Sequence, residues 1–244
     1  MFDFIIEFFT KNGGALLDYA IQIPCVIFAL AIHELAHGYM AYKLGDPTAK
    51  EEGRLSLNPL KNIDPIGAIC LFLFQVGWTR PVPVLPDNFK NKRAGVILTS
   101  LAGPVANFVA SYIFTVLYMG MIGIETKLTV IDGRDLGFGG FLLTAFSNFL
   151  ILIAGFNLLL AIFNLLPIFP LDGSRVLMMA LPNRVRKPIL RYEKYIAIGF
   201  VVLLIIDSFY TRFILNSLQS LFDFFMTNCF VPPYEKLLTR ILFG

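Results

Sequence analysis

Three apolar stretches, each long enough to cross a lipid bilayer, constrain the fold of this chain more than any other feature. They extend from about Leu16 to Tyr42, from about Arg93 to Gly120 and from about Gly140 to Phe169. A membrane-spanning helix needs about 20 predominantly apolar residues, and each stretch exceeds that length. With 57% hydrophobic and only 15% charged residues, the 244-residue chain is too apolar for a soluble domain. The sequence therefore predicts an all-α, multi-pass membrane protein.

The C-terminal part of the chain predicts further helices. A fourth span covers about Ile196 to Tyr210. The stretch from Phe213 to Val231 is either a fifth span or an interfacial helix, because Gln219 and Asp223 interrupt its apolar run. Since no repeat, low-complexity tract or linker divides the chain, we expect a single domain over residues 1–244, a bundle of four to five transmembrane helices.

The charges of the connecting loops predict the direction of the spans, because loops rich in lysine and arginine lie mostly in the cytoplasm. The loop after the first span and the loop after the third are both basic. The connection between the second and third spans carries only Lys127 and Arg134, beside three acidic residues. We therefore expect both basic loops in the cytoplasm and residues 137–140 outside, so that spans one and three are parallel and span two runs back.

The loop between the first two spans contains an apolar run that is too short to cross the bilayer. Residues 64–87 read DPIGAICLFLFQVGWTRPVPVLPD. Non-helical backbone is tolerated at membrane depth only where it packs against protein or a wet cavity. We expect a re-entrant or β-hairpin-like segment here. Its residues 77–84 could pair with an extended substrate as an added strand, or could merely cap the bundle.

The first span contains the pattern HExxH, from His33 to His37. Residues four apart on a helix face the same way, so both imidazoles can reach one metal ion. Zinc suits such a site because it accepts imidazole and carboxylate ligands, and Glu34 can take a proton from the attacking water. A charge at the centre of the bilayer costs roughly 2.5–3.5 kcal/mol on insertion scales, so these residues need a function or a partner. The alternative is a polar cluster hydrogen-bonded to a neighbouring helix.

A catalytic zinc ion usually has three protein ligands, and His33 and His37 are the only histidines of the chain. With no suitable cysteine, the third ligand must be a carboxylate if one chain makes the site. Asp172 is the best candidate, because it follows two prolines that end the third span and precedes Gly173, which allows a turn toward the bundle. Asp64 is the reserve candidate, although a proline follows it and favours a turn there.

Two amide side chains lie on apolar spans, Asn107 on the second and Asn164 on the third. They could orient the zinc ligands or donate hydrogen bonds to the oxyanion of peptide hydrolysis. Ordinary hydrogen bonding between helices is an equally good explanation for each. Asp46 and Arg54 are expected to anchor loops near the cytoplasmic mouth of the site.

These motifs resemble those of the site-2 protease family, the intramembrane zinc metalloproteases of peptidase family M50. The pattern HELAH with its following glycine matches the first family motif, and the segment Asn164–Gly173 fits the second, NxxPxxPLDG. The resemblance covers about residues 20–180. The other matching segments, similar to compact bacterial-type members, are Ser100–Pro104 with Asn107, Gly45–Ala49, Gly53–Arg54 and Leu57–Pro59.

The resemblance implies a three-span catalytic core with one zinc ion per chain, bound by His33, His37 and Asp172, and with Glu34 as general base. It implies regulated intramembrane proteolysis of membrane-spanning or membrane-inserted substrates. It also implies a prokaryotic plasma membrane, with the active site toward the cytoplasm and the lipid bilayer as partner. We expect neither a PDZ nor a CBS module in these 244 residues. The alternative function is a catalytically inactive scaffold or another metal-binding membrane protein.

Nucleic-acid binding is not expected for this chain. Its net charge is only +3, and the basic residues are scattered rather than clustered. A nucleic-acid surface would need a basic patch or a recognisable binding module.

Overall fold

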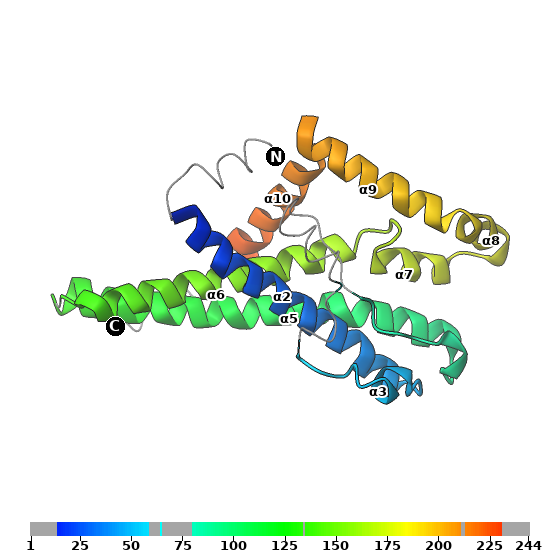
Figure 1. Ribbon diagram of the computed structural model, residues 1–244, viewed down its shortest axis with the longest axis horizontal. Helices are drawn as coiled ribbons and strands as arrows, with labels where there is room; N and C mark the ends of the chain where they lie inside the picture. The colour runs from blue at the N-terminus through cyan, green and yellow to red at the C-terminus, as the bar shows by residue number, and fades with distance from the viewer. Residues whose placement is uncertain (1–13, 59–63, 65–79, 134, 211–212, 231–244) are drawn as a thin grey trace.

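The computed structural model describes residues 14–58, 64, 80–133, 135–210 and 213–230. Within these ranges the chain is helical and contains no β-strand. Three long helices form the core, and a short helix, α3 (Thr48–Glu51), follows the first of them. Figure 1 shows α2 crossing the antiparallel pair of α5 and α6. The core helices are α2 (Gly14–Lys43), α5 (Lys92–Thr126) and α6 (Gly137–Asn164).

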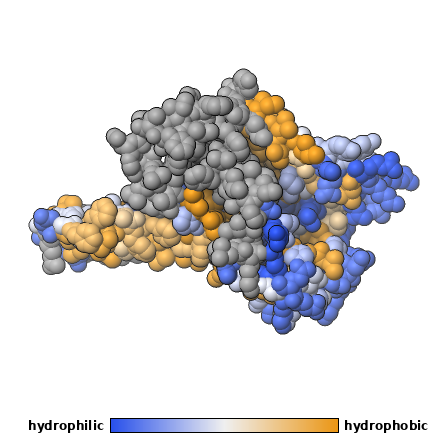
Figure 2. Space-filling view, in the orientation of Figure 1, coloured by the Kyte–Doolittle hydropathy of each residue, from blue (hydrophilic) through white to orange (hydrophobic). Residues whose placement is uncertain are grey.

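All three core helices are long and apolar enough to cross a membrane, over Gln22–Lys43, Lys92–Ile131 and Gly137–Asn164. Helices α2 and α6 run in the same direction and α5 runs back, which agrees with the order expected from the loop charges (Figure 1). Figure 2 shows hydrophobic residues along the α5–α6 pair, while hydrophilic residues gather at the opposite end of the molecule. Length and surface together indicate a helical membrane protein.

The ends of α5 and α6 differ from the predicted limits. Helix α6 ends at Asn164, five residues before the predicted Phe169, because the prolines that follow cannot donate the backbone hydrogen bonds of a continuing helix. Helix α5 continues past the predicted Gly120 to Thr126 and then into a π-helical turn, Lys127–Ile131. At about 1.5 Å per residue α5 is roughly 50 Å long, well beyond the ~30 Å hydrocarbon core of a bilayer.

The C-terminal helices are α7 (Asp172–Ala180), α8 (Asn183–Arg191), α9 (Glu193–Tyr210) and α10 (Phe213–Phe225), which a π-helical turn extends over Met226–Phe230. Helix α9 covers the predicted fourth span, and α10 with its π-helical turn covers most of the fifth. Neither is among the three described helices that are long and apolar enough to cross a membrane. The three-helix core is therefore established, and a total of four to five spans stays a prediction.

Most of the predicted re-entrant or β-hairpin-like segment, residues 65–79, lies outside the described residues. Its described end, Arg80–Leu85, has no regular secondary structure and leads into a 3-10 turn, Pro86–Asn88. We call Arg80–Leu85 the strap. The guanidinium of Arg54 donates hydrogen bonds to two strap carbonyl oxygens, at 2.7 Å to Arg80 and 3.4 Å to Pro81.

Asp46, just after α2, is fully buried and joins the end of this helix to the strap. Its Oδ1 accepts hydrogen bonds from the Thr48 hydroxyl at 2.5 Å and the Asn88 amide at 2.8 Å. Its Oδ2 accepts from the backbone N–H of Leu85 at 2.7 Å. Burial alone would raise the pKa of Asp46, but these hydrogen bonds hold it below its ordinary value. Asp46 and Arg54 both anchor loops, as their positions in the sequence predicted.

Replacing Asp46 by alanine should destabilise the protein by about 2–4 kcal/mol, because the backbone N–H of Leu85 and the side-chain amide of Asn88 lose a charged, fully buried acceptor. In the wild type this stabilisation is present above the unfolded-state pKa and is lost as the pH falls through the lower folded-state pKa. Thermal unfolding in detergent at several acidic pH values measures both effects. The matched control is Asp87→Ala, whose carboxylate is 86% exposed. Equal melting temperatures for the two variants would contradict the anchoring role.

Candidate metal centre

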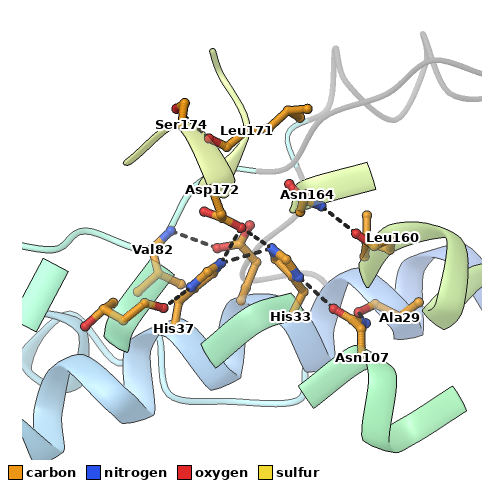
Figure 3. Close-up of polar contacts among 12 residues, drawn as sticks. Ala29, His33, His37, Val82, Asn107, Leu160, Asn164, Leu171, Asp172 and Ser174 are labelled. Carbon is orange, nitrogen blue, oxygen red and sulfur yellow. Dashed lines mark hydrogen bonds and ion pairs between the residues drawn. The ribbon is translucent and has the colours of Figure 1, made fainter. Parts of the chain in front are cut away.

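The side chains of His33, His37 and Asp172 meet at one point of the core (Figure 3). The two histidine Nε2 atoms lie 2.9 Å apart. Asp172 Oδ2 lies 3.0 Å from Nε2 of His33 and 3.1 Å from Nε2 of His37. Among the described residues, this is the one group of three His, Cys, Asp or Glu side chains placed to hold a metal ion. The reserve candidate, Asp64, is not part of it.

The local fold explains why Asp172 reaches the histidines. His33 and His37 lie one turn apart on α2, and Asp172 is the first residue of α7. A Cβ atom on Gly173 would overlap with the backbone carbonyl oxygens of Leu165 and Leu166, at the end of α6. Only glycine therefore lets α7 begin directly against the end of α6, and this contact holds the Asp172 carboxylate beside α2.

The hydrogen-bond partners of the imidazoles indicate their tautomers. His37 Nδ1 lies 2.7 Å from the carbonyl oxygen of Thr99, which can only accept, so this nitrogen carries the hydrogen. His33 Nδ1 lies 2.6 Å from Oδ1 of Asn107. The Asn107 amide nitrogen donates to the carbonyl oxygen of Ala29 at 3.0 Å, so its oxygen is the atom that faces His33. In neutral imidazoles both Nε2 atoms are then unprotonated.

Three acceptor atoms therefore face one another without a hydrogen between them, and they repel unless a positive charge lies among them. Little water reaches them, since His33 and His37 are 5% and 9% exposed and the Asp172 side chain 18%. Their separations of 2.9–3.1 Å approach the ~3.3 Å expected between tetrahedral ligands about 2.0–2.1 Å from zinc. Two imidazole nitrogens and one carboxylate oxygen are also a usual donor set for catalytic zinc. The residues fit this metal.

Glu34 lies on α2 beside the two histidines and is 6% exposed. Its Oε2 accepts a hydrogen bond from the backbone N–H of Val82 at 3.0 Å. Val82 belongs to the strap, which Arg54 and Asp46 hold in place. Asp46 and Arg54 therefore determine the position of the backbone group that orients the Glu34 carboxylate.

Two glycines allow neighbouring chain segments to approach the motif closely. A Cβ atom on Gly103 would lie 2.5 Å from Nε2 of His37 and 2.7 Å from Cε1 of His33, so α5 contacts both rings through bare backbone. A Cβ atom on Gly38 would lie 2.7 Å from Cδ2 of Leu55 and 3.1 Å from Cγ1 of Val82. Gly38 therefore leaves room for the strap beside α2.

The two predicted amides have different partners. Asn107 contacts His33 directly, whereas the Asn164 amide donates to the carbonyl oxygen of Leu160 on its own helix, at 3.0 Å. Sequence reasoning missed Asn157, although it is an amide on an apolar span, which is the signal that identified the other two. The Thr99 carbonyl and the Val82 N–H had no such signal, because every residue carries a backbone carbonyl and nearly every one an N–H.

Gly103→Ala should weaken zinc binding by about 10–100-fold, because the added methyl group displaces both imidazoles from the positions needed to ligate one ion. Chelator competition on the purified protein measures the affinity, and unfolding of the metal-free protein reports on folding. Gly120→Ala is the matched control, since a Cβ atom at this position of α5 meets nothing within 4 Å. Unchanged zinc affinity in Gly103→Ala would contradict the close contact.

Comparison with known proteins agrees with this geometry. Residues 21–206 match the model of peptidase family M50. Over 183 residues the chain is 39% identical to "Putative zinc metalloprotease YwhC" of Bacillus subtilis (strain 168), covering 74% of this chain and 77% of that protein. Over 221 residues it is 28% identical to "Putative zinc metalloprotease Rip2" of Mycolicibacterium smegmatis, covering 88% and 77%.

No solved structure matches the chain significantly. The family model nevertheless covers most of the chain, including both histidines and Asp172. This confirms the resemblance found in the sequence motifs: the chain belongs to peptidase family M50.

Proposed function

We propose that this protein is an intramembrane zinc metalloprotease that hydrolyses peptide bonds of membrane-spanning or membrane-inserted proteins. The observation that carries the proposal is the buried group of His33, His37 and Asp172 within a core of three helices apolar enough to cross a membrane. Membership of a peptidase family supports the hydrolytic activity, and two relatives are named as zinc metalloproteases. A site enclosed by such helices favours substrates that lie in the bilayer, as in regulated intramembrane proteolysis.

In this proposal His33, His37 and Asp172 hold one zinc ion per chain. Zinc bound there would supply Lewis-acid chemistry, which polarises a peptide carbonyl group and makes water more acidic. Glu34 takes the proton from the attacking water and passes it to the leaving amine. The N–H of Val82 holds Oε2 of Glu34 in place for both transfers.

We assign different roles to the two amides. Asn107 donates both amide hydrogens, to Ala29 and Asn157, while its oxygen accepts from His33. It therefore orients His33 and has no hydrogen left for an oxyanion. The Asn164 amide donates one hydrogen bond, to Leu160, and its second N–H could serve the oxyanion of the tetrahedral intermediate.

The strap is the proposed site for an extended segment of substrate. A helical substrate hides its peptide bonds in its own hydrogen bonds, so it must be locally extended before attack. The Val82 and Leu85 N–H groups already bind Glu34 and Asp46, and prolines supply no N–H. Pairing with a substrate strand would therefore depend on the N–H groups of Arg80 and Val84 and on the strap carbonyl oxygens.

The proposed location is a prokaryotic plasma membrane, with several spans and with the metal centre toward the cytoplasm. The basic loops support this orientation. One precedes the start of α5 and the other follows the end of α6, so both lie at the same end of the antiparallel pair. The hydrophilic end in Figure 2 includes this region.

Glu34→Gln should keep zinc but lower the cleavage rate by about 10²–10⁴-fold, because the amide cannot take a proton. Asp172→Asn should lower zinc affinity and thereby cleavage, because it replaces an anionic ligand with a neutral one. The measurement is cleavage of tagged single-span proteins in liposomes, with metal content determined for each variant and with Asp87→Asn as control. Equal cleavage and equal zinc content in all variants would refute the assignment. Zinc binding without cleavage of any single-span protein by the wild type would favour the scaffold alternative.

A photo-crosslinker at Val84 should capture a substrate bound to the Glu34→Gln variant, because the strap lies beside the carboxylate through Val82. The control position is Val185 on α8, which is 46% exposed and distant in sequence from the strap. Capture at Val185 but not at Val84 would contradict the proposal that the strap binds substrate.

A further inference from the structure

Asn157, on α6, is completely buried, and its side-chain hydrogen bonds join Asn107 and Ile153 rather than a ligand atom of the metal centre. Its Oδ1 accepts a hydrogen bond from the Asn107 amide at 2.7 Å, and its own amide nitrogen donates to the carbonyl oxygen of Ile153 at 2.7 Å. An unpaired amide is expensive in an apolar helix bundle, so these two bonds explain how the residue is accommodated. They also fix which end of the Asn157 amide faces Asn107. The Ile153 carbonyl can only accept, so it binds the Asn157 nitrogen and leaves the oxygen for Asn107.

The orientation of the Asn157 amide determines the orientation of the Asn107 amide, which in turn determines the tautomer of His33. The Ile153 carbonyl makes Asn157 present its oxygen to Asn107. Asn107 must then present its nitrogen to that oxygen and to the carbonyl of Ala29, which turns its own oxygen toward His33. Figure 3 shows Asn107 between Ala29 and His33. The oxygen of Asn107 requires a hydrogen on Nδ1 of His33, which leaves Nε2 with its lone pair.

Without the acceptor on Asn157, rotating the Asn107 amide by half a turn would break one donated hydrogen bond, to Ala29, instead of two. The rotated amide would therefore be less disfavoured than in the wild type. Its NH₂ group would then face Nδ1 of His33 and favour the tautomer with hydrogen on Nε2. That hydrogen would occupy the atom that faces His37 and Asp172. Outer-shell partners that select a histidine tautomer typically change metal affinity by about 10–100-fold.

We propose that Asn157 is a positioning residue of the metal centre, which acts through Asn107 to keep Nε2 of His33 available as a ligand. This inference rests on the proposed function, because it assumes that His33 binds zinc. The chain of contacts also connects all three core helices, through Ala29 on α2, Asn107 on α5 and Asn157 on α6. A purely structural role would therefore affect folding, whereas a positioning role affects zinc affinity in folded protein.

The first experiment measures the zinc affinity of purified full-length variants in detergent by competition with a chelator. Asn157→Leu should weaken zinc binding about 10-fold, because leucine has a similar size but no acceptor. Asn157→Asp should stay within about threefold of wild type, because a carboxyl group buried at this depth is protonated and can both donate to Ile153 and accept from Asn107. Ser147→Ala is the control for packing, since Ser147 is equally buried on the same helix.

The second experiment tests whether Asn157 acts through Asn107. In an Asn107→Leu background, adding Asn157→Leu should change zinc affinity by less than about twofold, since the relay is already broken. A full 10-fold loss in that background would overturn the proposal, and so would wild-type affinity in Asn157→Leu alone. If Asn157→Leu does not fold, Asn157→Ser replaces it, because the short hydroxyl cannot reach Asn107.

The same measurements separate this inference from the proposed function. His33→Ala should lose zinc binding if the metal centre is correct. Loss in His33→Ala together with wild-type affinity in Asn157→Leu would overturn the inference and leave the metal centre intact. Wild-type zinc affinity in His33→Ala would overturn both.

Discussion

The repulsion among three acceptor atoms, Nε2 of His33, Nε2 of His37 and Oδ2 of Asp172, is the constraint on which the rest of the core depends. Held 2.9–3.1 Å apart in a buried position, these atoms are compatible only with a positive charge among them. The residues that surround the site either position one of these three atoms or favour the histidine tautomer that has no hydrogen on Nε2. The glycines at 103 and 173 act by absence of a side chain, since each allows backbone to approach where a methyl group would not fit.

A second set of polar contacts lies between the end of α2 and the strap. Asp46 and Arg54 bind the strap from two sides, and the strap in turn binds Glu34 through the N–H of Val82. A backbone N–H thus helps to orient the expected proton-transfer group. A movement of the strap would change the position of Glu34, so the proposed binding of substrate at the strap would be physically linked to the orientation of this carboxylate.

The membrane makes these hydrogen bonds more selective than they would be in water. Buried polar groups of a bilayer protein have no solvent with which to exchange hydrogen bonds, so an amide left unpaired within the bundle is costly. From α5, Asn107 satisfies three partners at once: His33 and Ala29 on α2, and Asn157 on α6. Such an amide holds helices together and selects a histidine tautomer by the same contacts. At Asn107, helix packing and selection of the His33 tautomer depend on the same contacts. Substitutions at Asn157 can separate the two effects, because Asn157 does not bind His33.

The sequence by itself determined the three core spans, their relative directions and the two histidines, and it made Asp172 the best candidate for the third ligand, with Asp64 in reserve. These features depend on the length of apolar runs, on helical periodicity, on loop charge and on residues of rare type, all of which are local properties of the chain. Only the tertiary structure decided how far α5 extends and which backbone groups bind His37 and Glu34. It also showed that Asn157 binds the side of the Asn107 amide that faces away from His33. The decisive hydrogen bonds join residues 48 to 139 positions apart. Two of them use backbone groups that nearly every residue carries, so these partners follow from the packing of the chain and not from the identity of a residue.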